Sequence, residues 1–258
     1  MERKRMLLGL SLLICIAGAG LWAEALCGEA TAAADGKVAG PYGLLQYASY
    51  VYMPSLQRSY RIWHDNFDQS AINPVWSWMN EEAGNWSLSA RPGFLRIHCH
   101  RGAYFSKNLL YQTAPQGDFT VTTHVLFAPT DNFQSAGLVL YQDQNNHISL
   151  FRAHCSHDPP VCTGQANGVY FDYIKNGANS GPNYGITTGS PDEVYLRVER
   201  QGLTYTAYVS DDGITWTRMG SHTPSGMNLT WVGLGTGNDQ VDRRLPADFD
   251  FFDLRGSS

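Results

Sequence analysis

Apolar and polar residues alternate along most of the chain beyond residue 63. In "VYLRVER", Val194, Leu196 and Val198 would share one face of an extended strand, and the residues between them would share the other. Similar stretches follow at short intervals, separated by turn sequences such as "DQNN" and "SDDG". Because no segment carries a long apolar repeat with a period of 3.6 residues, the pattern is typical of an all-β sandwich or barrel. The expected strands are 86–90, 94–99, 119–127, 136–141, 147–153, 169–174, 194–200, 204–210, 215–219, 231–236 and 248–254.

Two of these strands are apolar in both phases of the alternation. They are "GLVLYQ", with Leu138 and Leu140 in one phase and Val139 and Tyr141 in the other, and the following "HISLFRAH". Strands covered on both faces lie in the middle of a sheet rather than at its edge. We therefore expect this hairpin to be central, with an aromatic second face.

A tight turn is expected in "SARPGFL". Pro92 pre-sets φ for the second turn position, and Gly93 supplies the positive φ that the third position of a type II turn needs. The stretch is therefore interpreted as a structural turn between two strands and not as a chemical motif.

The N-terminal residues "MERKRMLLGLSLLICIAGAGLWAEALC" combine basic residues, an apolar run and an A-x-A sequence. These are the parts of a secretory signal peptide. We expect a signal peptide over residues 1–25, with cleavage as late as 34, and a secreted, cell-surface or periplasmic protein. Retention of this segment as an anchor is the alternative, and would place the protein at a membrane. Residues 35–61 mix Gly, Pro and Tyr without periodicity and are interpreted as a linker or N-terminal extension.

The charge of the chain argues against nucleic acid as a partner. The net charge is −5, and no run of Lys or Arg follows the N-terminus. A nucleic-acid-binding domain carries a clustered basic patch. We therefore do not expect nucleic acid as a partner.

Cys155 and Cys162 bracket the short polar loop "SHDPPV". In an oxidising compartment a local disulfide between them is the simplest interpretation. A metal site with the adjacent His154 and His157 is the alternative, although the spacing matches no common zinc motif. Cys99 falls in the inward phase of its strand and is expected to be buried.

Several segments resemble a known family in order and spacing. They are "DNFDQSAINPVWSWMNEEAGNWSLSARPGFLRI", "LLYQTAPQGDFTVTTHVLF", "SAGLVLYQDQNNHISL", "VYLRVERQGLTYTAYVSDDGITWTRM" and "ADFDFFDLR". Together they are similar to the concanavalin A-like domain that follows the catalytic propeller of family-43 β-xylosidases, and to related stand-alone domains. The resemblance implies a concanavalin A-like jelly-roll β-sandwich over residues 63–255. It does not carry over xylosidase activity, because no propeller precedes the sandwich.

Catalytic carboxylates are not evident. The E-x-D-x-x-E motif of glycosidases with this fold is absent. Asp248 and Asp250, roughly 7 Å apart along an extended strand, are the pair whose spacing suits glycoside hydrolysis. Alternatively, these two and the Asp65 and Asp68 of "DNFD" would hold a structural Ca²⁺, or would simply be solvated. No other cofactor is indicated.

Sugar binding needs aromatic rings that stack on pyranose faces and planar polar groups that fix their orientation. Residues of both kinds lie on or beside the central strands. The candidate ligand-binding residues are Tyr141, Gln142, Arg152, His154, Tyr170, Tyr173, Arg197 and Trp231. The sequence therefore predicts an exported, non-catalytic carbohydrate-binding protein whose partner is a polysaccharide or oligosaccharide. The alternatives are a glycoside hydrolase and a structural or protein-interaction domain without a sugar ligand.

Overall fold

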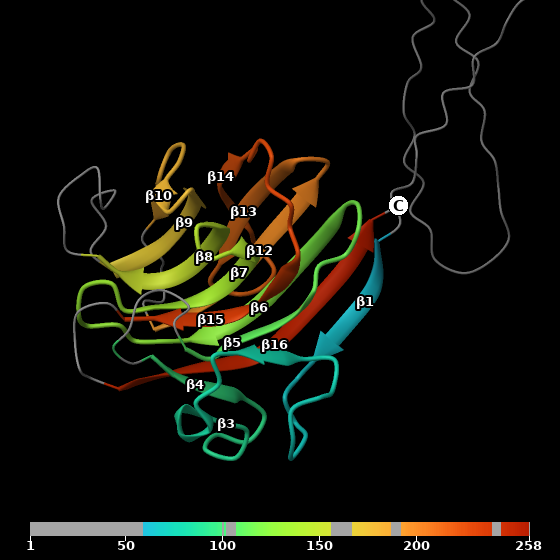
Figure 1. Ribbon diagram of the computed structural model, residues 1–258. Coiled ribbons are helices and arrows are strands. Elements are labelled where there is room, and N and C mark those ends of the chain that lie inside the picture. Colours follow the sequence, from blue (N-terminus) through green and yellow to red (C-terminus); the bar gives the residue numbers. More distant parts are fainter. Residues whose placement is uncertain are drawn as a thin grey trace, which may run out of the picture. The chain divides into compact units, whose positions relative to one another are not determined.

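The protein is described by a computed structural model that covers residues 59–99, 101, 107–155, 167–186, 192–238 and 244–257. Within these ranges the chain forms two antiparallel β-sheets that lie face to face (Figure 1). Helical structure in the described ranges is limited to the short turn η1 (Ala83–Asn85). No helix in this part of the chain is long and apolar enough to span a membrane. The predicted all-β fold is confirmed.

Each sheet has a continuous path of hydrogen-bonded strands. Sheet A follows the order β14 (Thr217–His222), β13 (Thr204–Ser210), β12 (Glu193–Gln201), β6 (Phe119–Leu126), β16 (Leu245–Ser257), β4 (Leu95–Cys99) and β3 (Trp86–Ser87), and β1 (Ser59–Asp65) also pairs with β16. Sheet B follows the order β10 (Ala178–Asn179), β9 (Asn167–Lys175), β8 (Asn146–His154), β7 (Ser135–Asp143), β15 (Trp231–Gly237), β5 (Leu109–Thr113) and β2 (Ser77–Met79), and β11 (Tyr184–Ile186) also pairs with β9. The hairpin β7–β8 is therefore central, as its doubly apolar sequence predicts.

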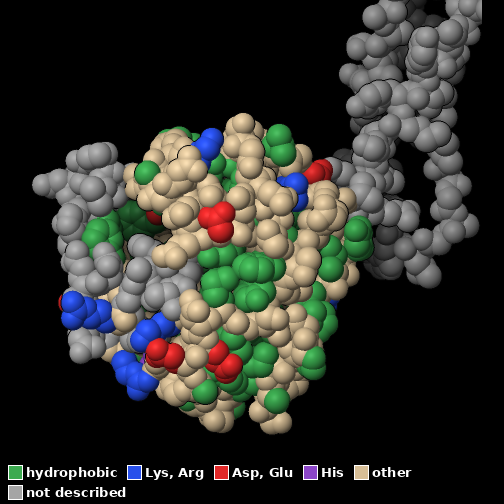
Figure 2. Space-filling view, viewed as in Figure 1, with side chains coloured by type: hydrophobic (Ala, Val, Ile, Leu, Met, Phe, Trp, Pro, Cys, Tyr) green, Lys and Arg blue, Asp and Glu red, His purple; other side chains and the backbone are tan. Residues whose placement is uncertain are grey.

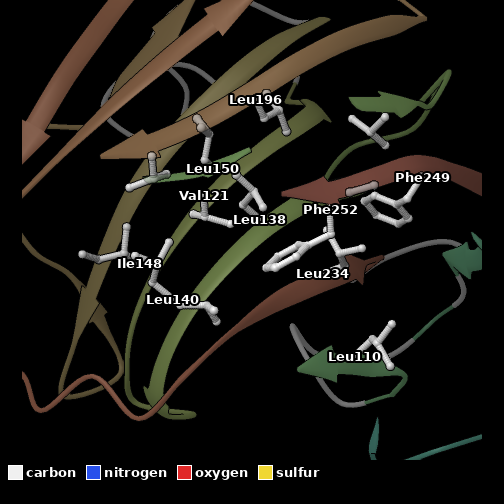
Figure 3. Packing of buried hydrophobic residues seen from close by; sticks show 14 of the residues in the cluster. Leu110, Val121, Leu138, Leu140, Ile148, Leu150, Leu196, Leu234, Phe249 and Phe252 are labelled. Atoms are coloured by element: carbon white, nitrogen blue, oxygen red, sulfur yellow. The ribbon is translucent and has the colours of Figure 1, made fainter. Parts of the chain in front are cut away.

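The core lies between the facing surfaces of the two sheets. In β12, every second residue from Val194 to Val198 is completely buried, and its neighbours are half-exposed. Burying one such aliphatic side chain contributes about 1.5–3 kcal/mol to stability. Figure 3 shows side chains from sheet A meeting those from sheet B: Val121, Leu196, Phe249 and Phe252 against Leu138, Leu140, Ile148 and Leu150.

The turn predicted at Pro92–Gly93 is present. The amide of Phe94 donates to the carbonyl of Arg91 at 3.1 Å, and Gly93 has φ +79°. The strand before this turn is shorter than the sequence predicts. It ends at Ser87, whose hydroxyl accepts hydrogen bonds from the amides of Ser89 and Ala90 and so turns the chain away from the sheet.

The structure adds strands that the alternation does not mark. Residues 59–61, assigned from sequence to the N-terminal extension, begin β1, most of which is exposed and so carries no apolar alternation. Its backbone is paired with the far end of the chain, from Ser59 opposite Ser257 to Asp65 opposite Phe252. The remaining additions, β2, β5, β10 and β11, have two to five residues each, which is too short for a period to be recognised.

Gly233 is required where β15 lies against β5. A Cβ built on Gly233 would run into the backbone carbonyl of Leu110 on the neighbouring strand, and a backbone atom in a paired strand has little room to move. Gly233→Ala is therefore expected to lower the free energy of unfolding by about 1–3 kcal/mol, as measured by urea denaturation. Gly84→Ala is the control, because a Cβ at Gly84 meets no atom within 4 Å. Equal stabilities of the two variants would contradict this prediction.

Candidate functional site

The surface of sheet B that faces away from the core carries a row of stacked rings, which we call the aromatic platform. It consists of Tyr111 of β5, Trp231 of β15, Tyr141 of β7 and His147 of β8. Strand register places Trp231 opposite Tyr141 and Tyr141 opposite His147. The ring centroids of Tyr111 and Trp231 are 4.5 Å apart, those of Trp231 and Tyr141 are 5.7 Å apart, and those of Tyr141 and His147 are 6.2 Å apart.

The platform remains partly open to solvent. Tyr141 is 6% exposed because it lies between two other rings, whereas Tyr111 and Trp231 are half-buried. The ring planes of Trp231 and Tyr141 differ by 10°, so the two rings are nearly parallel. Tyr111 is tilted by 34° against Trp231, so the open part of the platform consists of these two half-buried rings, and exposed aromatic rings of this kind are surfaces on which the faces of sugar rings stack.

A pocket of about 280 Å³ lies at the His147 end of the platform. We call it the outer-face pocket. Its apolar walls include Phe133, Phe151 and Ala153, and its polar lining includes Ser149 and Asp172. Strand pairing accounts for this grouping, since Ser149 lies opposite Asp172 and the pocket residue Tyr170 lies opposite Phe151. The remaining lining residues are Ser135, His147, His154, Cys155, Ile174 and Asn179.

Two polar groups of the pocket are held in an apolar environment. Tyr170 is 7% exposed, and its buried hydroxyl has no hydrogen-bond partner. Burial raises the pKa of this hydroxyl to about 12. Burial also raises the pKa of Asp172 to about 6. The Tyr170 hydroxyl thus has no partner that replaces its lost contact with water, and the half-buried Asp172 accepts no hydrogen bond from the described residues.

His147 contributes a neutral ring. It is 5% exposed, and burial lowers its pKa to about 4, against the opposing effect of nearby backbone carbonyls and Asp143. At neutral pH the side chain that joins the platform to the pocket is thus uncharged. The site is built from neutral rings and hydroxyl groups with one carboxyl group, Asp172.

The structure brings together three of the residues that the sequence proposes for ligand binding. Tyr141, Tyr170 and Trp231 belong to one apolar cluster on the outer face of sheet B. His154 lines the outer-face pocket. Tyr141, Tyr170 and Trp231 therefore share one face, as the phase of their strands predicts, whereas His154 reaches the pocket from the last position of β8 although it has the phase of the inward-facing Arg152.

The other candidates lie elsewhere. Gln142 follows Tyr141 within β7 but stabilises the fold, because its Oε1 accepts a hydrogen bond from the amide of Asn228 at 2.7 Å. Tyr173 is 8% exposed and belongs to the core between the sheets, with the ring of His222 5.9 Å away. Gln142 thus stabilises a loop, and Tyr173 packs in the interior, so its ring is not open to a ligand.

Arg152 is completely buried. It follows Ile148 and Leu150 in the inward phase of β8, and its guanidinium donates to the carbonyls of Ala153 and Gly168 at 2.8 and 3.1 Å. Burial lowers its pKa to about 10, against the attraction of Asp192, so it remains charged at neutral pH. A buried cation with these partners holds strands β8 and β9 and does not reach solvent.

Arg197 lies on the outer face of the opposite sheet. Its guanidinium carbon is 3.7 Å from the ring centroid of Trp216, in a groove of about 480 Å³. Asp253 in the same groove accepts from Arg255 at 2.5 Å and lies 3.0 Å from Arg61. The charges of this groove are thus largely paired with one another, and Arg197 lies over one face of Trp216, which makes the groove a weaker candidate site than the aromatic platform.

The four aspartates considered for Ca²⁺ do not form a metal site. Asp65 is 4% exposed and accepts from the amide of Phe67 at 2.9 Å and the indole of Trp76 at 2.8 Å. Asp68 accepts from Asn66. Across the described ranges, no three His, Cys, Asp or Glu side chains are grouped to hold a metal ion. Asp65 instead fixes the entry of the chain into the core.

Asp248 and Asp250 have different partners. Asp248 accepts from Arg96 at 2.6 and 2.8 Å and from Arg91 at 3.2 Å. Burial alone would raise the pKa of Asp248, but these arginines outweigh it and the pKa is lowered. Asp250 faces the Nδ1 of His124 at 3.0 Å. A glycosidase acid needs a raised pKa, so the environment of Asp248 suits a structural ion pair rather than proton donation.

The proposed disulfide involves a residue outside the described ranges. Cys155 is described and 8% exposed, but Cys162, and the His157 of the alternative metal site, are not. The pairing therefore stays a prediction, as do the signal peptide and the extension up to residue 58. Cys99 is a free, buried thiol, as expected.

Several site residues were not recognised from sequence. Tyr111, His147, Ser149, Phe151 and Asp172 join the platform or the pocket. Period-two phase relates Asp172 to the recognised Tyr170. His147, Ser149 and Phe151 have the phase opposite to that of Arg152 and His154 on the same strand, and the strand register, with His147 opposite Tyr141 and Phe151 opposite Tyr170, is what relates them to recognised candidates. The position of Tyr111 could not be found in this way, because β5 itself was not recognised.

The visible surface is poor in charge. In Figure 2, hydrophobic side chains form several patches, while Lys and Arg gather beside Asp and Glu at the lower left of the view and charged side chains are few elsewhere. Such a surface offers little electrostatic attraction to a highly charged partner.

Two facing antiparallel sheets with this topology define a concanavalin A-like β-sandwich. Residues 64–255 match the family described as the β-xylosidase C-terminal concanavalin A-like domain. The chain belongs to this family, as the resemblance in the sequence implies.

Relatives of known activity are much longer than the matching region. The chain is 27% identical over 161 residues to a xylan 1,3-β-xylosidase of a Vibrio species, covering 60% of this chain and 28% of that protein. It is 27% identical over 237 residues to a non-reducing end α-L-arabinofuranosidase of Bacteroides ovatus, covering 86% of this chain and 41% of that protein. The chain thus spans less than half the length of these relatives.

A solved structure supports the fold independently. A GH43 protein of Bacillus licheniformis superimposes with a TM-score of 0.65 at 20% identity, covering 75% of this chain and 39% of that one. At this level of identity the likeness concerns the fold alone. The shared part is the β-sandwich.

Proposed function

We propose that this protein is an exported, non-catalytic carbohydrate-binding protein that holds a polysaccharide or oligosaccharide on the outer face of sheet B. The observation that carries this proposal is the aromatic platform. Its rings are aligned across four neighbouring strands, from Tyr111 to His147. A β-sheet fixes the spacing of such rings, so little ordering is needed when a chain of sugars stacks on them.

The chemistry of the surface supports a neutral glycan. The platform contains no charged side chain at neutral pH, because His147 has its pKa lowered to about 4. Stacking on aromatic faces uses the apolar C–H surface of a sugar, and neighbouring hydroxyl and amide groups meet its polar edge.

The relatives narrow the ligand class. Their names describe action on β-xylosides and α-L-arabinofuranosides, which are linkages of pentose sugars. Applied to this chain, the names of the relatives favour a pentose-containing polysaccharide over a charged glycan as the ligand. The proposed ligands are therefore β-xylan, arabinan and the oligosaccharides derived from them.

Export rests on the basic and apolar N-terminal segment together with its A-x-A sequence. N-terminal sequencing of the protein made in its own cells tests this part. A mature chain that begins after residue 25 or after residue 34 is the expected result. An intact N-terminus in the membrane fraction would identify an anchor instead.

Affinity electrophoresis tests the binding function itself. The protein is run through native gels with and without soluble β-xylan or arabinan, next to a non-binding protein of similar size. Retardation by one of these polymers and not by a polyanionic glycan is the expected result. Unchanged mobility in all of them would rule out the carbohydrate-binding function and favour a protein-interaction domain.

A further inference from the structure

The outer-face pocket contains a buried hydroxyl and a half-buried carboxyl group that have no hydrogen-bond partner among the described residues. The hydroxyl of Tyr170 has no hydrogen-bond partner although the residue is 7% exposed. No described residue donates a hydrogen bond to Asp172, which lies on the same face two residues further along β9. A buried hydroxyl without a partner costs about 1–3 kcal/mol, and such orphaned groups are few in native proteins. Their presence together in one cavity points to a ligand that supplies the missing partners.

The shape of the cavity limits the size of this ligand. The volume is about 280 Å³, which lies at the lower end of the range of roughly 300–1,000 Å³ found for small-molecule sites. Phe133, Phe151 and Ala153 form apolar walls. The polar groups are the hydroxyls of Ser149 and Tyr170 and the carboxyl of Asp172. A ring with hydroxyl groups on its edge and C–H groups on its faces fits this distribution of polar and apolar lining.

The position of the pocket relates it to the aromatic platform. Asp172 on β9 and Trp231 on β15 are separated by three strand spacings, or roughly 14 Å. His147 belongs to both, since it lines the pocket and stacks with Tyr141. A short oligosaccharide can therefore reach from the platform into the pocket.

We propose that the outer-face pocket receives the terminal sugar of a neutral glycan, with the Asp172 carboxylate accepting hydrogen bonds from two neighbouring hydroxyl groups and the Tyr170 hydroxyl pairing with a third. This rests on the proposed carbohydrate-binding function and adds recognition of the chain end to it. A terminal sugar can enter a hollow that holds one ring, because it is linked on one side only. A sugar inside a long chain is linked on both sides and stays on the platform.

The experiment compares Asp172→Asn and Tyr170→Phe with the wild type. Binding of xylo-oligosaccharides and arabino-oligosaccharides of one to five units is measured by calorimetry at about pH 8, where Asp172 is ionised and His147 is neutral. Asp172→Asn is expected to weaken oligosaccharide binding roughly tenfold or more, and Tyr170→Phe about threefold to tenfold. Tyr170→Phe should keep or raise the melting temperature, because it removes an unpaired buried hydroxyl, so its loss of affinity cannot be a folding defect.

The control is Asp211→Asn, which makes the same change of charge at an exposed residue of sheet A's β13–β14 turn. It should bind glycans like the wild type.

A second measurement uses one polysaccharide before and after partial hydrolysis, because hydrolysis multiplies chain ends at constant mass. Binding capacity per mass is expected to rise with the number of ends.

The outcomes separate this proposal from the function on which it rests. If the wild type binds polymer and both pocket variants bind all oligosaccharides equally well, the chain-end proposal is wrong and the carbohydrate-binding function stands. If the wild type binds no glycan, both are wrong. If tetramethylammonium binds in an Asp172-dependent way and oligosaccharides do not, the pocket is a cation site and the chain-end proposal is likewise wrong.

Discussion

Trp231→Ala abolishes retardation in gels that contain the bound polysaccharide, while the protein stays folded. The indole is the central ring of the platform, with Tyr111 4.5 Å away on one side and Tyr141 5.7 Å away on the other. Its removal deletes the largest stacking surface and separates Tyr111 from Tyr141 and His147. Central aromatic residues of a binding surface contribute at least about 2 kcal/mol, so affinity should fall about 30-fold or more. Titration calorimetry measures this loss, and circular dichroism at the same concentration confirms folding.

Trp216→Ala is the matched control for this prediction. Trp216 is also half-buried, but it lies on the outer face of sheet A beneath the guanidinium of Arg197. Its loss should leave glycan binding unchanged. If Trp216→Ala abolishes binding and Trp231→Ala does not, the groove on sheet A is the binding surface, and the assignment to sheet B is wrong.

Asp248→Asn destabilises the protein, and the loss depends on pH. The Asp248 side chain is 7% exposed and lies 2.6 Å from Arg96, so its substitution weakens charge-assisted hydrogen bonds in the middle of sheet A. Such bonds contribute about 1.5–3 kcal/mol each. We expect a decrease in the free energy of unfolding of this size at neutral pH, measured by urea denaturation.

The direction of the pH effect follows from the lowered pKa of Asp248. The folded protein holds this carboxyl ionised at pH values where the unfolded chain, with a pKa near 3.9, already binds a proton. The stabilisation is therefore complete above about pH 5 and is lost as the pH falls through the folded-state pKa. The stabilities of Asp248→Asn and the wild type should converge in acid. A difference that stays constant down to about pH 2 would show that the ion pair is not its cause, and Asp211→Asn serves as the control for a change of net charge.

The fold could be predicted because period-two alternation and burial coincide in most strands. In β12 and β13, the residues in the apolar phase are the buried ones. β1 and β5 could not be predicted in this way. β1 is mostly exposed and is held by backbone pairing with residues some 190 positions away, such as Asp253 opposite His64, and no local pattern records such pairing.

Only part of the site could be predicted from the sequence, again because a local pattern does not record what a strand packs against. Phase places Tyr141, Tyr170 and Trp231 on one face, but does not distinguish a face that meets solvent from one that meets the other sheet. Tyr173 and Arg152 have side chains suited to sugar binding and point into the interior. The Asp172 carboxyl was missed because an isolated aspartate in an apolar strand gives no spacing motif. Its significance comes from the cavity around it, which residues of β7, β8, β9 and β10 line.

The length of β16 affects how this chain folds during synthesis. β16 pairs with β6 along one side and with β4 and then β1 along the other, so sheet A has a gap in its middle until residues 245–257 have been made. Until then the edges of β6 and β4 that will face β16 are unpaired, and β1 has no partner strand among the described residues. Pairings across such long stretches of sequence fold slowly, in milliseconds to seconds. A ribosome that pauses before residue 245 would therefore carry an open, aggregation-prone half-sheet, and chaperone demand should be greatest at that stage.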